Sequence, residues 1–176
     1  MDVFVEQLIK ERRGMREHVM LFGVTLAAVL LVGAAILFFT PLAPMVLLAV
    51  GFGWWWCIKM LITEYEYSVT NGDIDIDRIR GRSKRLRLVS VRGEKIESFS
   101  SYKEGEPLDR YDRVVRCTTR EADARLWVFT YRSKRNGHTA VVFEPDDRVL
   151  NAFIEGLPYL LQREVCQKYD IPQISQ

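Results

Sequence analysis

Residues 64–80 read EYEYSVTNGDIDIDRIR. Apolar and polar side chains alternate on both sides of Asn71-Gly72, a pattern typical of two strands that each bury one face. Asn and Gly tolerate the positive φ angles that a two-residue hairpin turn requires. The stretch therefore predicts a β-hairpin formed by Glu64–Thr70 and Asp73–Ile79.

The chain after this hairpin continues as short alternating segments separated by turn residues. Gly81 marks the next turn, Lys103–Asp112 is a charged loop, and Asn136-Gly137 marks a tight turn between two later segments. The alternation predicts five further strands, at Lys84–Val91, Lys95–Tyr102, Val114–Thr118, Leu126–Tyr131 and Thr139–Phe143.

The period of the apolar residues changes after the last of these strands. Pro145 followed by Asp146 and Asp147 is a helix-start signal, since acidic groups stabilise the positive end of a helix. An interior proline interrupts a helix, so we expect a break near Gly156-Pro158 and a second helical segment to about Lys168. The apolar positions that recur at helical spacing are Val149, Leu150, Phe153, Ile154, Leu157 and Leu161.

About seven antiparallel strands in two packed sheets, capped by a C-terminal helix, are the layout of the pleckstrin-homology fold. The texts EYEYSVTNGDIDIDRIRGRSKR and FEPDDRVLNAFIEGLP, at residues 64–85 and 143–158, resemble a family of small bacterial membrane proteins with two spans and a pleckstrin-homology-like domain. The resemblance covers most of the chain. It implies a membrane α-hairpin joined to an α+β domain, and it implies no activity.

The segment upstream of the domain is almost wholly apolar. No charged side chain occurs between His18 and Lys59. A helix of about 20 residues crosses the hydrocarbon core, so Val19–Thr40 can span it and Pro41–Ile62 can return. A signal peptide has a shorter apolar core, and a buried hairpin of a soluble protein would keep a polar stripe on each helix. The sequence predicts a transmembrane hairpin.

Basic residues flank this hairpin on both sides, whereas its turn has none. By the positive-inside rule we expect a multi-pass protein of the cell membrane with both termini in the cytoplasm. Trp54, Trp55 and Trp56, with Lys59 one turn further on, are typical of an interface anchor, although an aromatic binding cluster is the alternative. The flanking basic residues are Lys10, Arg12, Arg13 and Arg16 on one side, and Lys59, Arg78, Arg80, Arg82, Lys84 and Arg85 on the other.

The first residues, Met1–Glu17, place four apolar side chains at helical spacing. We interpret them as an amphipathic helix on the inner leaflet. The predicted organisation is a cytoplasmic segment at 1–18, a transmembrane hairpin at 19–62 and a pleckstrin-homology-like domain at 63–176. Small residues in the first span allow either close packing of the two helices or a homo-oligomer. These residues are Gly23, Ala27, Ala28, Gly33, Ala34 and Ala35.

Composition and motifs argue against several classes of protein. A net charge of +2 gives no general support for nucleic-acid binding. Cys57, Cys117 and Cys166 lack a pairing or metal-ligand spacing, and His18 and His138 accompany no catalytic motif. The alternating acids Asp73, Asp75 and Asp77 are compatible with a cation site, but alternation on a solvent face explains them more simply and allows pairing with Arg or Lys on a neighbouring strand. We therefore expect no enzyme, metal site or cofactor.

One cluster of basic residues points to a function as an anionic-lipid contact. It consists of Arg78, Arg80, Arg82, Lys84, Arg85 and Arg87. It follows the second span closely, and each basic residue near an anionic surface contributes about 1 kcal/mol to attachment. The alternative is a charged strand edge that resists aggregation. The hypothesis is a non-enzymatic membrane protein whose cytoplasmic domain binds anionic lipid headgroups or a protein partner. The second hypothesis is an accessory subunit of a larger membrane complex.

Overall fold

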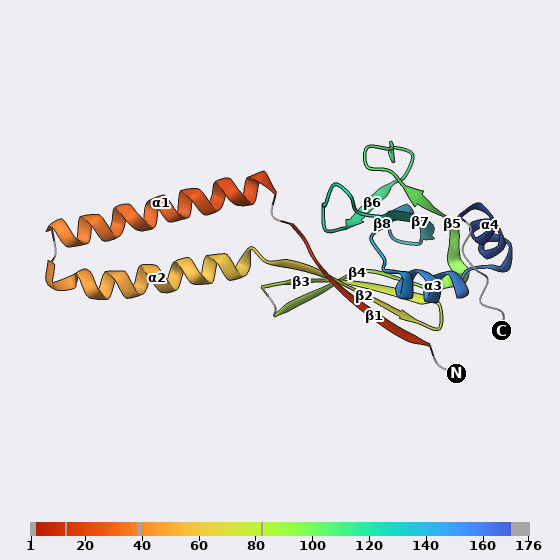
Figure 1. Cartoon of the computed structure of the whole chain (residues 1–176), viewed down its shortest axis with the longest axis horizontal. Coiled ribbons are helices and arrows are strands. Elements are labelled where there is room, and N and C mark those ends of the chain that lie inside the picture. Colours follow the sequence, from red (N-terminus) through yellow and green to blue (C-terminus); the bar gives the residue numbers. More distant parts are fainter. Residues whose placement is uncertain (1–2, 13, 39, 82, 170–176) are drawn as a thin grey trace.

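The computed structural model of the chain describes residues 3–12, 14–38, 40–81 and 83–169 (Figure 1). A helical hairpin projects from one end of a domain that contains two four-stranded sheets. The hairpin consists of α1 (Met15–Phe38), the 3-10 turn η1 (Thr40–Leu42) and α2 (Ala43–Met60). We refer to the end of the domain from which these helices leave as the hairpin end, and to the opposite end as the far end.

Both helices of the hairpin are long and apolar enough to cross a membrane, over Glu17–Phe38 and Thr40–Met60. Trp54 Nε1 donates a hydrogen bond across the hairpin to Thr25 Oγ1 at 3.0 Å. A Cβ atom added at Gly23 or Gly33 would meet nothing within 4 Å, so these two glycines mediate no close contact between the helices. The apolar surface of the hairpin is left almost entirely uncovered by the rest of the protein.

The first sheet is antiparallel and has the strand order β1-β2-β3-β4. Asn71 and Gly72 join β2 to β3 with φ angles of 50° and 83°, which confirms the predicted hairpin turn. Burial alternates in β2 and β3, as expected for strands with one face in a core. The strands are β1 (Phe4–Lys10), β2 (Thr63–Thr70), β3 (Asp73–Arg80) and β4 (Lys84–Val91).

The expected helix over Met1–Glu17 is wrong for Phe4–Lys10, which forms β1. Val5, Gln7 and Ile9 face inward whereas Phe4 and Leu8 are exposed, so burial follows a period of two although the apolar residues do not. Pairing decides the conformation, because β1 lies along β2 from Phe4 opposite Thr70 to Lys10 opposite Glu64. The helical hairpin is thus inserted between two paired strands.

The second sheet has the order β5-β7-β8-β6 and is mixed. β6 pairs with β8 in parallel, so the expectation of antiparallel strands throughout is wrong at this position. β6 and β8 are not consecutive in the chain, and the long connection that contains β7 allows them to run in the same direction, whereas strands joined by a tight turn pair antiparallel. The strands are β5 (Ile96–Tyr102), β6 (Arg113–Cys117), β7 (Leu126–Ser133) and β8 (Gly137–Phe143), and the turn η2 (Gly93–Lys95) precedes β5.

The two predicted C-terminal helices are confirmed as α3 (Asp147–Glu155) and α4 (Tyr159–Tyr169). Asp146 caps α3 by accepting a hydrogen bond from the Val149 N–H at 2.8 Å. Phe153 is fully buried, and its ring centroid lies 5.3 Å from that of Phe99 and 5.3 Å from that of Phe129. The helix thus closes the core between the sheets. Leu150, Ile154 and Leu157 are also buried, as predicted.

Backbone segments meet closely at the far end. A Cβ atom on Gly156 would lie 2.1 Å from the Gly72 Cα atom, and one on Gly93 would lie 2.2 Å from the Gly156 carbonyl oxygen. No side chain fits at these positions without a backbone shift. The junction of α3 and α4 is therefore seated directly on the β2–β3 turn and on η2.

Candidate functional site

The turn between β3 and β4 lies against the C-terminal end of α2. The Gly81 N–H donates to the Ile62 carbonyl at 3.0 Å, and the Ser83 N–H closes the turn on the Arg80 carbonyl at 3.2 Å. Gly81 has a φ of +59°, a conformation that glycine adopts without strain. A Cβ atom there would lie 3.5 Å from the Lys59 carbonyl oxygen. These contacts hold the β3–β4 turn beside the C-terminal residues of α2.

A cleft of about 410 Å³ lies at this junction, and we call it the junction cleft. Its chemistry combines apolar surface from α2 with cations from both elements. Such a combination suits a ligand with an acyl region and an anionic group. The lining residues are Trp56, Lys59, Met60, Arg80, Gly81, Ser83 and Lys84.

The cations of the junction cleft are not neutralised by the rest of the domain. The exposed side chains of Arg80 and Lys84 form no ion pair with any residue that the structure describes. The Lys59 Nζ atom lies 4.2 Å from the centroid of the Trp55 ring, a cation–π contact that leaves its charge uncompensated. Three positive charges therefore border the cleft without acidic partners among the described residues.

Two other members of the predicted cluster are engaged on the outer face of the first sheet. Arg85 makes two hydrogen bonds to the Glu66 carboxylate, at 3.0 and 2.8 Å. Arg87 pairs with Asp77 at 3.1 Å and with Asp75 at 3.4 Å. These contacts confirm the expected pairing with a neighbouring strand for Asp75 and Asp77, whereas Asp73 forms no ion pair with a described residue. Since β4 is an edge strand, Arg85 and Arg87 also fit the charged-edge alternative.

Arg78 occupies a third environment, on the face of β3 that carries the core. It is partly buried and lies opposite Tyr65. Desolvation, with a contribution from Glu11, raises the pKa of Tyr65 to about 12 although Arg78 acts to lower it. Arg82 lies outside the described residues. The structure thus brings Arg80 and Lys84 together at the cleft and separates them from Arg78, Arg85 and Arg87.

The predicted interface anchors, Trp54, Trp55, Trp56 and Lys59, lie in the last two turns of α2, next to the domain. Trp55 and Trp56 are about half exposed, at 47% and 49%, and both rings contact Phe52. Trp54 differs, because its indole N–H is used in the bond to Thr25. Trp56 and Lys59 also line the junction cleft, so these two residues connect the anchor to the basic turn.

Sequence reasoning missed a second connection at the hairpin end, made by the end of β1. The Arg12 N–H donates to the Thr119 carbonyl at 2.8 Å, and Arg120 pairs with Glu11 at 2.7 Å. The sequence carried no strand signal here, because Phe4-Val5 and Leu8-Ile9 are adjacent apolar pairs and the inward position between Val5 and Ile9 is the polar Gln7. The chain that enters α1 is therefore fastened to the loop between β6 and β7.

The candidate nucleophile Cys117 and the candidate general base His138 lie outside the junction cleft. Burial raises the pKa of the Cys117 thiol to about 12, which disfavours the thiolate needed of a nucleophile. His138 Nε2 lies 3.0 Å from a Glu97 carboxylate oxygen beside a turn. Within the described ranges, no three His, Cys, Asp or Glu residues are grouped in a way that could hold a metal ion.

Comparison with known proteins assigns the domain. Residues 1–161 match a family model described as a bacterial PH-like domain (DUF6106). No curated protein and no solved structure is significantly similar to the chain. The match includes β1, the helical hairpin, both sheets and α3.

Proposed function

Because the chain belongs to the bacterial PH-like domain family DUF6106, we propose that it is a membrane-anchored binding module that holds an anionic lipid headgroup in the junction cleft. The helical hairpin anchors the protein in the cell membrane. The domain faces the cytoplasm and the inner leaflet, as the distribution of basic residues favours.

The observation that carries the proposal is the contrast between paired and unpaired cations. Arg85 and Arg87 are held by acidic residues of the sheet, whereas Arg80 and Lys84 have no such partners among the described residues. An anion that enters the cleft therefore meets charges that are not already neutralised. At about 1 kcal/mol for each basic residue, Lys59, Arg80 and Lys84 together contribute roughly 3 kcal/mol.

The position of the cleft fits a ligand that belongs to the bilayer. Trp56 and Met60 are on α2, so the apolar wall of the cleft is continuous with the surface that faces the acyl chains. Lys59 and Trp55 mark the depth at which ammonium and indole groups prefer to lie. A headgroup phosphate at this depth is within the reach of the β3–β4 turn.

Retention of lipid by the full chain in detergent tests the proposal. The protein is incubated with equimolar phosphatidylglycerol and phosphatidylcholine, and the lipids that remain bound are counted by native mass spectrometry. We expect wild-type protein to retain phosphatidylglycerol preferentially. The double variant Arg80→Gln/Lys84→Gln should bind it about thirtyfold more weakly, as the loss of about 2 kcal/mol implies.

The matched control is Arg85→Gln/Arg87→Gln, which removes the same formal charge from the same sheet but outside the cleft. It should retain phosphatidylglycerol as wild-type protein does. If both double variants lost phosphatidylglycerol equally, the effect would be one of net charge. If neither variant lost it, the junction cleft would be excluded as the lipid-binding site. In the second case a defined set of co-purifying membrane proteins would favour the accessory-subunit hypothesis.

A further inference from the structure

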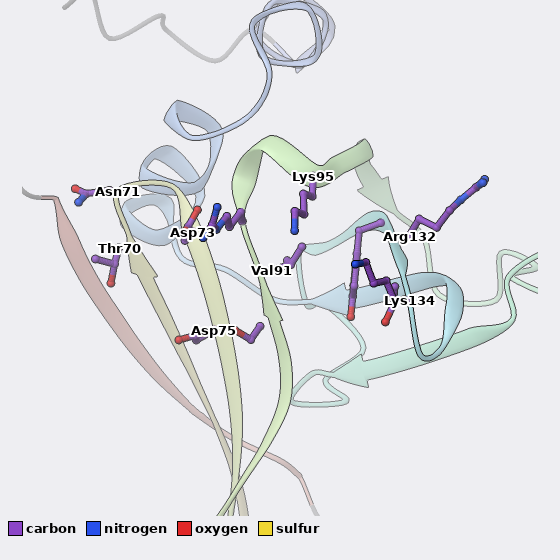
Figure 2. Close-up of a pocket in the computed structure, with 12 residues that line it drawn as sticks. Thr70, Asn71, Asp73, Asp75, Val91, Lys95, Arg132 and Lys134 are labelled. Atoms are coloured by element: carbon purple, nitrogen blue, oxygen red, sulfur yellow. The ribbon is translucent and has the colours of Figure 1, made fainter.

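A second cleft, of about 620 Å³, lies at the far end of the domain (Figure 2). One wall is formed by β3 and β4, and the other by η2 and the turn between β7 and β8. Asp75 lines this cleft and Arg80 lines the junction cleft, so at about 3.3 Å per residue roughly 17 Å of β3 separates the two. A lipid bound at the hairpin end cannot occupy it.

Basic side chains from separate parts of the sequence meet at this far cleft. Arg92 and Lys95 come from the segment after β4, and Lys134 comes from the β7–β8 turn. All three side chains are exposed, and none forms an ion pair with a residue that the structure describes. In Figure 2 the Lys95 side chain extends into the space between the two walls.

The acidic residues of the cleft are already engaged by the protein. Asp73 Oδ1 accepts a hydrogen bond from the Gly93 N–H at 3.2 Å, which fixes η2 against β3. Asp75 pairs with Arg87 at 3.4 Å. Arg132, which also lines the cleft, lies 3.6 Å from Glu97. Asp75 and Arg132 are thus paired with opposite charges, whereas Asp73 keeps its negative charge because the Gly93 N–H is neutral. The three basic residues without an acidic partner among the described residues, Arg92, Lys95 and Lys134, outnumber it and leave the cleft with a net positive charge.

Hydroxyl groups complete the lining. Ser133 Oγ accepts a hydrogen bond from the Arg135 N–H at 3.3 Å, so its own proton remains available for donation. Ser90 lies on the opposite wall, on β4. Hydroxyl donors together with ammonium and guanidinium groups are the partners that phosphate oxygens accept from.

We propose that the far cleft binds a small soluble anion that carries phosphate groups. Its size falls within the range of roughly 300–1,000 Å³ typical of small-molecule sites. Its distance from the hairpin excludes the headgroups of the membrane that anchors the chain. The domain then binds a soluble anion at one end and a lipid at the other, through two sites that share no lining residue.

The test uses inorganic pyrophosphate as the probe and the full chain in a neutral detergent. Calorimetric titration at low salt should show saturable binding with one site per chain. Lys95→Gln/Lys134→Gln should weaken it at least tenfold. The matched control Lys103→Gln/Arg163→Gln removes the same charge from exposed positions outside the cleft and should leave the affinity unchanged.

Two further arms separate the far cleft from other sources of binding. Arg80→Gln/Lys84→Gln should not alter pyrophosphate affinity, whereas an equal loss there would assign the anion to the junction cleft. Polyglutamate should bind more weakly than pyrophosphate, and tighter binding of the peptide would favour an acidic protein partner. Non-saturable binding, or an equal loss in the Lys103→Gln/Arg163→Gln control, would overturn the proposal.

Discussion

Lys10 and Glu64 lie opposite each other at the last position of the β1–β2 ladder. The pairing continues one residue further, where the Glu11 N–H donates to the Thr63 carbonyl at 3.0 Å. The whole helical hairpin therefore occupies the place of a turn between two adjacent strands. The two chain segments that connect it to the domain are fixed side by side.

This pairing predicts that the hairpin is replaceable by a short turn. A chain in which Glu11 is joined to Thr63 by Asn-Gly should be soluble and monomeric, and circular dichroism should show mostly β structure. Residues 63–176 alone should be far less stable, because they lack Ile9 from the core and the Gln7 amide, which bonds to the Glu144 carbonyl and the Asp146 N–H. Equal melting temperatures for the two chains would contradict a role of β1 in the fold.

The same relationship predicts membrane topology. Since residues 10 and 64 are paired, both must lie on one side of the bilayer, and the Thr40–Leu42 turn must lie on the other. From the basic flanks and the positive-inside rule we expect the paired side to face the cytoplasm. A reporter fused after Gln176 should be active only inside the cell, and one inserted within Pro41–Pro44 only outside. The opposite pattern would reverse the orientation.

Removal of the Phe153 side chain should destabilise the domain by roughly 3–5 kcal/mol, as expected for a buried aromatic residue. Its ring is fully buried among Phe99, Phe129 and Phe143. Chemical unfolding of the full chain, followed by fluorescence of the buried Trp127, measures the effect. Tyr159→Ala serves as the control because that side chain is 72% exposed. Similar unfolding midpoints for the two variants would place α3 outside the core.

Gly156→Ala should destabilise the far end by about 1–3 kcal/mol, the usual cost of overpacking. The new methyl group would collide with the Gly72 backbone, which cannot move without opening the β2–β3 turn. Gly53→Ala is the matched control, since a Cβ atom at that helical position meets nothing within 4 Å. Differential scanning calorimetry should show a lower melting temperature for the first variant only.

Stability should decline in alkaline solution. Burial raises the pKa of the Cys117 thiol from 9.0 to about 12 and raises the pKa of Tyr67 well above 10.0. The unfolded chain then loses these protons at a lower pH than the folded chain. The free energy of unfolding is therefore maintained below pH 9 and falls between pH 9 and 12. Cys117→Val should reduce the decline of the free energy of unfolding with pH, measured by chemical unfolding at a series of alkaline pH values. An unchanged decline would show that the thiol contributes nothing to it.

Local patterns were sufficient for most of the domain. The alternation around Asn71-Gly72 and the helix start at Asp146 depend on neighbouring residues, and both were predicted correctly. Phe4–Lys10 was not, because its apolar residues have helical spacing and its partner strand is distant in sequence. The parallel pairing of β6 with β8 likewise depends on where β7 lies.

The candidate site was predictable only as a group of residues. The sequence places six basic residues between 78 and 87 but does not indicate which of them acidic neighbours neutralise. That distinction arises from register, since Arg87 lies opposite Asp77 and Arg80 opposite Lys84 at the open end of the ladder. The far cleft had no signature, because Lys95 and Lys134 are brought together by the pairing of β5 with β7, two strands that are distant in sequence.

The insertion of the hairpin between β1 and β2 also sets an order of events during synthesis. The ribosome delivers β1 first, and its partner emerges only after both apolar helices have been made. Until then β1 has an unpaired edge and no core to cover. β1 therefore remains unpaired until the whole hairpin and β2 have been translated, so the first strand pair of the domain forms only on a chain whose hairpin is complete.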